Sequence, residues 1–481
     1  MPDALSRGVR WLLERQDAAG WWTDELETNV TMTAEHVLLL RFLGVPIDQI
    51  RDGSIAHLLH HQREDGSWAL YFDGPADLST TIEAYVALKV LGVDAASTPM
   101  RRALGVIRRL GGAADARVFT KIWLALFGCY PWSGIPTMPP ELVYLPPQLP
   151  FNLYNFSCWA RGTVAPLTLV ISRRPVRDLG VSVDEIVVEG TESRLARVPG
   201  SGVFWWLDAL LKLYERSPVK PARNFARRRM ARWIEARQEA DGSWGGIQPP
   251  WVYSLIALDL EGFRLDHPVM RKGLSGMERF AVSDKTGWRF SACMSPVWDT
   301  AWVVRALRAA GVRPEDASMR RAISWLLDEQ IAVGGDWQVR CRERECGGWA
   351  FEFDNDIYPD VDDTAVVVLA LLEGGQPDMV TPAVERAVRW TRAMRSSNGG
   401  WAAFDRNNTD EIAYRIPFAD FGAMIDPPSE DVTAHVLEML GALGRDESDS
   451  DVRSALEYLW RTQRRDGSWF GRWGVNYVYG T

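Results

Sequence analysis

Apolar residues return at three- and four-residue spacing through a series of short segments along the chain. Examples are SIAHLLHHQ, MARWIEARQ, ISWLLDEQ and ALEYLWRTQ. This spacing places the apolar side chains on one face of an α-helix. We therefore expect a chain built largely from amphipathic helices.

A Gln, a Gly and a Trp recur where these helices are expected to end. The pattern Gln, three residues, Gly, any residue, Trp occurs at Gln16-Gly20-Trp22, Gln62-Gly66-Trp68, Gln238-Gly242-Trp244 and Gln463-Gly467-Trp469, with variants at Gln330-Gly335-Trp337 and Arg395-Gly399-Trp401. Gly lets the backbone turn at a helix end, and Trp can stack on the Gln amide while covering the next helix start. Each repeat is thus predicted to be a helix closed by a turn, with Gln and Trp joining neighbouring repeats.

Repeats of this kind bury their apolar faces only against one another, which predicts an all-α fold, arranged as an array or a closed ring of paired helices. A chain of 481 residues also exceeds what one hydrophobic core usually supports, so two domains or one long helical array is expected. Pro-rich or irregular stretches at 131–151 and near 186–202 interrupt the helical pattern and are predicted to be long loops.

Composition adds an aromatic excess and excludes one class of partner. The chain holds 23 Trp, which calls for a repeat or an aromatic cavity. Its net charge of -9 provides no basic surface for nucleic acid. The five cysteines are odd in number and widely spread, and the first residues hold no secretion signal, so reduced thiols in the cytoplasm are expected. Cys341 and Cys346 lack the second Cys or His pair of a zinc site.

Membrane contact, if present, is expected at the surface of the bilayer. No window approaches the ~18 continuous apolar residues of a membrane span. Residues 203–232 open with an apolar amphipathic run and continue with a run of basic residues. That pattern fits a helix lying in an anionic membrane surface, and it also fits the solvated face of a repeat.

Three carboxylates, Asp360, Asp362 and Asp363, crowd one predicted helix start, and the aromatic stretch 347–355 precedes them. Clustered buried acids retain protons, because their charges repel and burial disfavours ionisation. A retained proton makes a general acid. Helix capping explains the same acids equally well when they are taken alone.

Protonation of an unactivated alkene needs an acid in a water-poor pocket, followed by groups that stabilise carbocations without attacking them. Aromatic faces meet the second need by cation-π attraction. The candidates are Trp159, Trp337, Phe351, Phe404, Phe418, Phe421, Trp473, Tyr477 and Tyr479, with His435 as a candidate partner of the acid. Each aromatic residue alone is more often a core residue, so it is their concentration beside the carboxylates that favours a catalytic site.

Several stretches, in order, resemble the signatures of squalene-hopene cyclases. They are GGIQPPW (245–251), SPVWDT (295–300), YPDVDDTAVV (358–367), DPPSEDVTAH (426–435) and GSWFGRWGVNYVYG (467–480). The resemblance covers residue 8 to the end. It implies two α-α barrels of the α6/α6 type: one at 26–292, inserted into a second made of 1–25 and 293–481. It also implies a substrate cavity between them and a chain that attaches to the cytoplasmic face of the inner membrane from one side.

The resemblance also implies roles for individual residues. Asp362 is the expected proton donor, with Asp360 and Asp363 as acidic neighbours, His435 as the hydrogen-bond partner that raises its acidity, and Asp431 supporting His435. Trp159, Trp337, Phe351, Phe418, Trp473 and Tyr479 match cavity aromatics, Gln248 and Tyr253 match the polar end near the last cation, and Glu35, Glu83 and Arg117 match supporting polar residues. The expected reaction is the isomerisation of squalene to hopene, with hopanol from water capture. No cofactor or metal is implied. The expected partners are squalene or a similar polyene and a membrane surface, and a homodimer is left open.

Two departures from the family pattern affect these expectations. Phe404 stands where the family commonly has Tyr, which removes a hydroxyl near the first-formed rings and favours early termination. Family members also continue beyond Thr481, so we expect an incomplete second barrel. The alternatives are a class II cyclase of a shorter prenyl diphosphate and an inactive fragment. A protein prenyltransferase is disfavoured because its zinc-binding set is missing, and a class I synthase because no magnesium motif appears.

Overall fold

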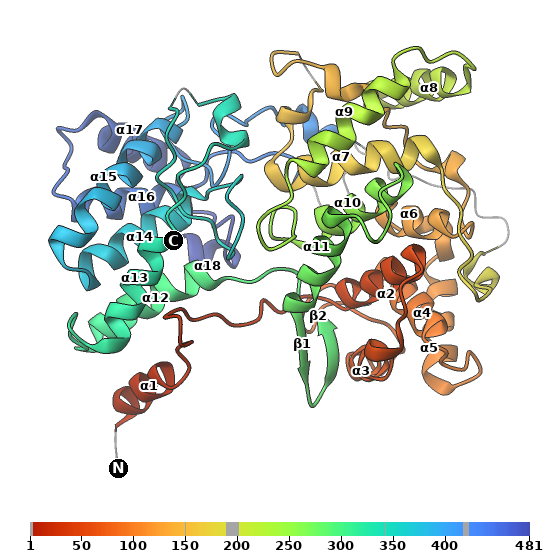
Figure 1. Ribbon diagram of the computed structural model, residues 1–481, viewed down its shortest axis with the longest axis horizontal. Helices are drawn as coiled ribbons and strands as arrows, with labels where there is room; N and C mark the ends of the chain where they lie inside the picture. The colour runs from red at the N-terminus through yellow and green to blue at the C-terminus, as the bar shows by residue number, and fades with distance from the viewer. Residues whose placement is uncertain (1–2, 150, 189–201, 342, 417–422) are drawn as a thin grey trace.

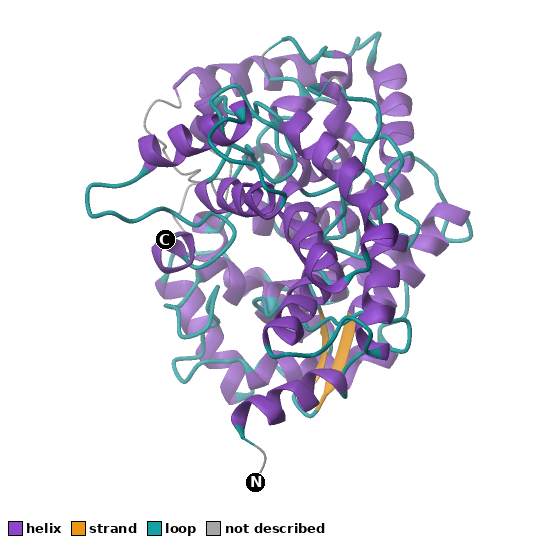
Figure 2. Cartoon of the chain, turned by 90° about the vertical axis from the view of Figure 1, so that its left-hand side faces the viewer, coloured by secondary structure: helices purple, strands orange, loops and turns teal. Residues whose placement is uncertain are grey.

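The computed structural model describes residues 3–149, 151–188, 202–341, 343–416 and 423–481. These residues are mostly helical, and the prediction of an all-α fold is confirmed (Figure 2). Within the described ranges, the one sheet is a hairpin of β1 (Ala281–Asp284) and β2 (Gly287–Phe290), paired antiparallel. No helix in these ranges is both long and apolar enough to cross a bilayer.

The repeat motif ends its helices as predicted, and it also joins elements that are distant in sequence. At the second repeat, the Gln62 amide donates to the carbonyl of Gly66 at 3.0 Å and to that of Pro99 at 2.9 Å. Gly66 has a φ of 91°, where a side chain would also collide with the backbone of a neighbouring helix. The Trp68 indole donates to the carbonyl of Leu58 at 2.8 Å. The motifs at Gln16 and Gln238 bond a second segment in the same way, whereas the Gln463 amide bonds the carbonyl of its own turn, Gly467.

The variant motif at Gln330 closes differently from the prediction. Gln330 donates to the carbonyl of Gly347 at 2.7 Å, and the Trp349 indole donates to the carbonyl of Leu326 at 2.5 Å. The closing residues are therefore Gly347 and Trp349, and the assignment of Gly335 and Trp337 was wrong. The residues between Gln330 and Gly347 loop out from the repeat, so spacing alone pointed to the wrong Gly and Trp.

The residues of the first hydrophobic core lie mainly between Val30 and Phe290, and a few others lie near 413–425. Its helices lie together on the right of Figure 1. They are α2 (Thr31–Leu43), α3 (Asp48–His60), α4 (Leu78–Val90), α5 (Thr98–Arg109), α6 (Val118–Leu126), α7 (Cys158–Arg173), α8 (Gly202–Arg216), α9 (Arg223–Glu235), α10 (Gln248–Leu260) and α11 (Pro268–Met277). α7 and α10 pack closely and reach toward the second core.

The second core joins Trp22 to the chain from Val297 to Ala455. Its helices are α12 (Pro296–Ala309), α13 (Ala317–Asp328), α14 (Val361–Gly374), α15 (Pro377–Met394), α16 (Glu430–Ala442) and α17 (Ser450–Thr462), with α1 (Ala4–Leu13) and α18 (Asn476–Gly480) at its margins. α14 lies at the centre, packed against α12, α13, α15 and α16. Its start carries the three clustered carboxylates.

Short 3-10 turns connect these elements. They are η1 (Gly112–Asp115), η2 (Trp132–Gly134), η3 (Pro140–Tyr144), η4 (Leu153–Asn155), η5 (Asp184–Ile186), η6 (Glu278–Phe280), η7 (Asp336–Val339) and η8 (Glu411–Arg415). The predicted loop at 131–151 contains two of them.

Candidate active site

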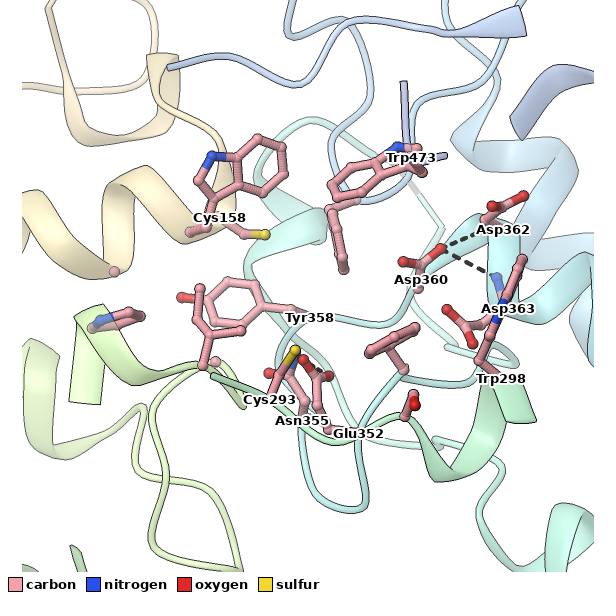
Figure 3. Close-up of a pocket in the computed structure, with 18 of the residues that line it drawn as sticks. Cys158, Cys293, Trp298, Glu352, Asn355, Tyr358, Asp360, Asp362, Asp363 and Trp473 are labelled. Carbon is pink, nitrogen blue, oxygen red and sulfur yellow. Dashed lines mark hydrogen bonds between the residues drawn. The ribbon is translucent and has the colours of Figure 1, made fainter. Parts of the chain in front are cut away.

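Asp360 caps the helix that carries the other two aspartates. Its carboxylate accepts hydrogen bonds from the backbone N–H groups of Asp362 at 2.6 Å and Asp363 at 3.2 Å (Figure 3). Its own N–H donates to the carbonyl of Trp349 at 2.7 Å. Capping therefore accounts for Asp360, but it leaves the side chains of Asp362 and Asp363 buried in the first turn.

His435 reaches Asp362 from the neighbouring helix α16. Its Nδ1 lies 2.7 Å from Oδ1 of Asp362. The ring packs beside two indoles of α12, with centroid distances of 6.0 Å to Trp298 and 5.9 Å to Trp302. Because α14 and α16 pack side by side, two residues 73 positions apart form one acid and base pair.

Burial gives this group of acids unusual proton affinities. It raises the pKa of Asp360 and Asp363 well above the ordinary value, and repulsion between neighbouring carboxylates adds to the effect. Burial also raises the pKa of Asp362, although the hydrogen bond and charge of His435 oppose it. Burial lowers the pKa of His435, but the contact with Asp362 outweighs burial and the net shift is upward. The pair thus favours a protonated imidazole beside an acid that can hold its proton.

Asp431 lies on the same helix as His435, one turn earlier. It accepts hydrogen bonds from the Ser429 hydroxyl at 2.6 Å and from the backbone N–H of Trp473 at 2.8 Å. Across the described ranges, the hydrogen bonds of its carboxylate do not include one to His435, so its influence on His435 is through charge. Asp431 thereby ties the chain near Trp473 to the start of α16.

The clustered acids open into a cavity of about 790 Å³, which we call the larger cavity. This volume lies within the ~300–1,000 Å³ that is typical of small-molecule sites. Five of the aromatic residues predicted from the sequence line it: Trp159, Phe351, Phe404, Trp473 and Tyr479. Three of these form an edge-to-face cluster, with centroids 5.4 Å apart for Trp159 and Trp473, 5.9 Å for Trp159 and Phe404, and 5.8 Å for Phe404 and Trp473.

A second cavity of about 480 Å³, the smaller cavity, shares Trp159, Ile247 and Ala423 with the larger one. Tyr253 lines it, with the supporting polar residues Glu35, Glu83 and Arg117. Gln248 lies behind this wall and donates to Glu35 at 3.0 Å. Burial, the main cause, raises the pKa of Glu35 to about 7, although the hydrogen bond from Gln248 opposes it. The polar residues of the smaller cavity thus lie in a different cavity from Asp362, and Trp159 of the aromatic cluster lines both.

The remaining aromatic candidates lie elsewhere. Trp337 is buried in the second core, edge-to-face with Trp390 at 6.0 Å, and does not line either cavity as the described residues define them. Tyr477 is not itself among the lining residues, but it packs on Phe470, which lines the larger cavity. Phe418 and Phe421 lie outside the described residues. The substrate contacts expected of Trp337, Phe418 and Phe421 stay predictions.

Several polar residues of the larger cavity were not predicted from the sequence. Glu352 and Asn355 stand on one wall with Cys293, and Tyr358 lines the same cavity (Figure 3). The sequence held one sign of Glu352 and Asn355, since both lie within the aromatic stretch that precedes the aspartates. A Glu and an Asn at these positions are equally typical of a loop. Within the described ranges, no three Asp, Glu, His or Cys side chains are grouped as a metal site would need.

This arrangement can deliver a proton into an apolar space walled by aromatic rings. Asp362 is buried, lines the larger cavity and has His435 on its Oδ1. The indole and phenyl rings that line the same cavity attract positive charge but carry no nucleophile. The site thus suits acid-initiated chemistry on a hydrocarbon.

Comparison with known proteins places the chain in a family. Residues 5–286 match the model of the squalene-hopene cyclase N-terminal domain, and residues 294–481 match that of the C-terminal domain. A squalene–hopene cyclase of Alicyclobacillus acidocaldarius is 50% identical, and the alignment covers 99% of this chain and 76% of that protein. A dammaradiene synthase of Dryopteris crassirhizoma is 38% identical, over 100% of this chain and 73% of that protein. A squalene–hopene cyclase of Zymomonas mobilis is also 38% identical, over 99% of this chain and 75% of that protein. The chain belongs to the squalene-hopene cyclase family.

Proposed function

We propose that this protein is an isomerase that cyclises squalene to hopene after protonation by Asp362. The observation that carries the proposal is the 2.7 Å contact between His435 and Asp362 at the wall of an aromatic cavity. Relatives named squalene–hopene cyclase, 38% and 50% identical to this chain, support the same substrate and product.

Initiation follows from the geometry of the acid pair. The Asp362 O–H bond breaks, and its proton forms a C–H bond with the terminal alkene of squalene, which leaves a tertiary carbocation on the adjacent carbon. The protonated His435 stabilises the new carboxylate through the hydrogen bond to Oδ1. The pKa values of Asp360 and Asp363 are raised by burial, so these acids hold their protons more tightly than ordinary carboxyl groups and add less negative charge beside Asp362.

Ring closure then moves the positive charge past the aromatic wall. The faces of Trp159, Phe404 and Trp473 stabilise each cation without forming a bond to it, by about 0.5–2 kcal/mol per ring. The same rings hold the polyene in a folded shape, because they leave only a narrow apolar space. The absent hydroxyl of Phe404 is expected to favour early termination.

The last cation would reach the polar wall of the smaller cavity, near Tyr253 and Gln248. Loss of a proton there gives hopene, an isomer of squalene, and capture of water gives hopanol. Glu35 and Glu83 are suited to hold such a water, since both line this cavity or contact its wall and both have raised pKa values through burial.

The test is incubation of detergent-solubilised protein with squalene, with products analysed by gas chromatography and mass spectrometry. The native chain should form pentacyclic triterpene, and Asp362→Asn, which keeps the shape but not the acid, should lose about 10²- to 10⁴-fold in turnover. Glu329→Gln, which removes a carboxyl outside the cavities, is the control. Turnover of a prenyl diphosphate in place of squalene, or a fully active Asp362→Asn, would contradict the proposal.

Attachment to a membrane surface forms part of the proposal. On α8, Val203, Trp206, Leu210 and Leu213 are all at least 60% exposed, which is unusual for apolar side chains on one helix. Other residues of α8, Leu207 and Leu211, line the smaller cavity. A bilayer that covers the exposed face of α8 would thus lie close to this cavity, which suits a substrate dissolved in lipid.

The domain division at 26–292, against 1–25 with 293–481, is proposed on the two hydrophobic cores. Trp22 packs in the second core, and Val30 begins the first. The two family models also meet between residues 286 and 294. A homodimer and a location on the cytoplasmic face of the inner membrane stay predictions.

A further inference from the structure

Glu352 is a second buried acid on the wall of the larger cavity. It lies in the turn between Trp349 and α14, on the same wall as Asn355 and Cys293 (Figure 3). Its carboxyl group rests against Gly246, where an added Cβ would lie 2.4 Å from the carboxyl carbon. Glycine at this position therefore leaves the space that the acid occupies.

The surroundings of Glu352 leave its carboxyl group free to change protonation state. Its oxygen Oε2 accepts one hydrogen bond, from the Asn355 amide at 2.9 Å. Within the described ranges, no Lys or Arg forms an ion pair with it. Burial raises the pKa of Glu352 to about 7, although the hydrogen bond from Asn355 opposes it. Both the acid and the carboxylate are thus populated near neutral pH.

The position of Glu352 determines which carbocation intermediates can contact it. It shares the larger cavity with Asp362, whereas Tyr253 and its polar neighbours line the smaller cavity. Figure 3 shows Glu352 at the lower centre and Asp362 at the upper right, with Asp360 between them in this view. A carbocation formed in the first ring closures would therefore reach Glu352 before the far end of the polyene has reacted.

We propose that Glu352 is a proton acceptor in the larger cavity that ends a share of cyclisations early. The step removes a proton from a carbon next to the cationic centre of a partly cyclised intermediate. The C–H bond breaks, its electron pair forms a C=C bond, and Glu352 becomes a neutral carboxylic acid that later returns the proton to water. The proposal rests on the proposed function, since it uses the carbocations that Asp362 generates.

Few other titratable groups influence the pKa of Glu352. Asp241, in the turn that ends the third repeat, adds repulsion that raises its pKa. Asp363 at the start of α14 interacts with Glu352 by charge, and so do the thiols of Cys158 and Cys293. Burial raises the pKa of both thiols above their ordinary value, so they stay neutral while Glu352 titrates, and burial raises the pKa of Asp363 as well.

The share of partly cyclised products should increase with pH. Raising the pH through about 7 converts Glu352 to the carboxylate, which is the form that accepts a proton. Its carboxylate fraction is roughly one tenth a pH unit below the pKa and nine tenths a unit above it. The ratio of partly cyclised olefins to pentacyclic products should rise accordingly. This ratio does not depend on the rate of initiation, because both products descend from the same first protonation.

The experiment measures this product ratio between about pH 6 and pH 8 for three proteins supplied with squalene. In the native chain it should rise by about five- to ninefold. In Glu352→Gln it should stay at the low-pH value. Glu329→Gln is a matched control, because burial also raises the pKa of Glu329 to about 7 but Glu329 lines neither cavity, so this variant should keep the native rise.

A rise in Glu352→Gln equal to the native one would overturn the inference, as would a flat ratio in a native chain that turns squalene over. A flat native profile overturns the inference even if Glu352→Gln fails to fold. If the native chain forms no cyclised product at any pH, the proposed function fails and the inference fails with it, so the two failures are distinguishable.

Discussion

The central requirement at the residue scale is an acid that keeps its proton and yet gives it up to an alkene. Burial meets the first demand by raising the pKa of Asp362. His435 meets the second, because its hydrogen bond and positive charge stabilise the carboxylate that remains after transfer. The two effects act in opposite directions on one carboxyl group, and catalysis depends on both.

Replacing His435 by Ala should separate these two effects. Activity needs protonated Asp362, so turnover falls as pH rises through the apparent pKa of the pair. Without His435 the pKa of Asp362 is raised further, so this alkaline limb should move to higher pH while maximal turnover drops by about 10²- to 10⁴-fold. The measurement is squalene turnover against pH.

The control for this prediction is His267→Ala, which removes an imidazole that caps a distant helix, α11. It should leave the pH profile unchanged. An alkaline limb that moves to lower pH in His435→Ala would show that His435 does not lower the pKa of Asp362.

At the scale of single elements, the repeat motif makes a prediction about stability. Gln62 bonds two carbonyls, one in its own turn and one in α5, whereas Gln463 is exposed and bonds the carbonyl of Gly467 at 2.9 Å. Gln62→Ala should therefore lower the free energy of unfolding by about 1–3 kcal/mol, and Gln463→Ala by about 1 kcal/mol or less. Chemical denaturation followed by circular dichroism measures both. Equal losses would contradict a joining role for the Gln.

Helix α8 carries the prediction for membrane attachment. Changing Trp206 and Leu210 to Ser should weaken binding to anionic phospholipid vesicles at least about tenfold, because each side chain would lose the free energy of entering the apolar layer. Cosedimentation with vesicles measures the binding. Phe72→Ser is the control, since Phe72 is 89% exposed in the loop before α4 and should not contribute. If the control weakens binding as much as the α8 variant, another face meets the membrane.

The elements show what the sequence could and could not predict. Apolar periodicity predicted the helices, and the Gly positions predicted their ends, because both are local properties. Gln330 was paired with the wrong Gly and Trp because a long loop separates it from Gly347. The pairing of Asp362 with His435 came from the resemblance, since local pattern says nothing about contacts between α14 and α16. Glu352 was missed because burial, which a sequence does not show, is what makes it unusual.

At the scale of the whole molecule, Arg161 links the two cores. It lies fully buried on α7 and pairs with Asp336 at 3.0 Å and Asp405 at 3.4 Å, both from segments beside the second core. Arg161→Leu would leave these carboxylates buried without this cation, so the free energy of unfolding should fall by about 3–5 kcal/mol. Denaturant unfolding measures the change. The matched control on the same helix is Arg173→Leu, which removes an exposed Arg from Glu261 but leaves that carboxylate paired with Arg227, and should cost about 0–1 kcal/mol.

If Arg161→Leu unfolds like the native protein, the two cores do not depend on this pair for their association. In that case the cavities between them would be held by apolar packing alone. The prediction therefore also concerns the shape of the site, because Trp159 on the same helix lines both cavities.

The most direct test of the central claim is the mass of the product formed in heavy water. Asp362 exchanges its proton with solvent, so in D₂O it should deliver deuterium to the terminal alkene, and the final loss of a proton leaves that deuterium in place. The native protein should form a cyclised product one mass unit heavier than squalene, carrying a single deuterium bound to carbon. Asp362→Asn should not form this product. A cyclised product without deuterium would show that an acid other than an exchangeable carboxyl group starts the reaction and would contradict the account.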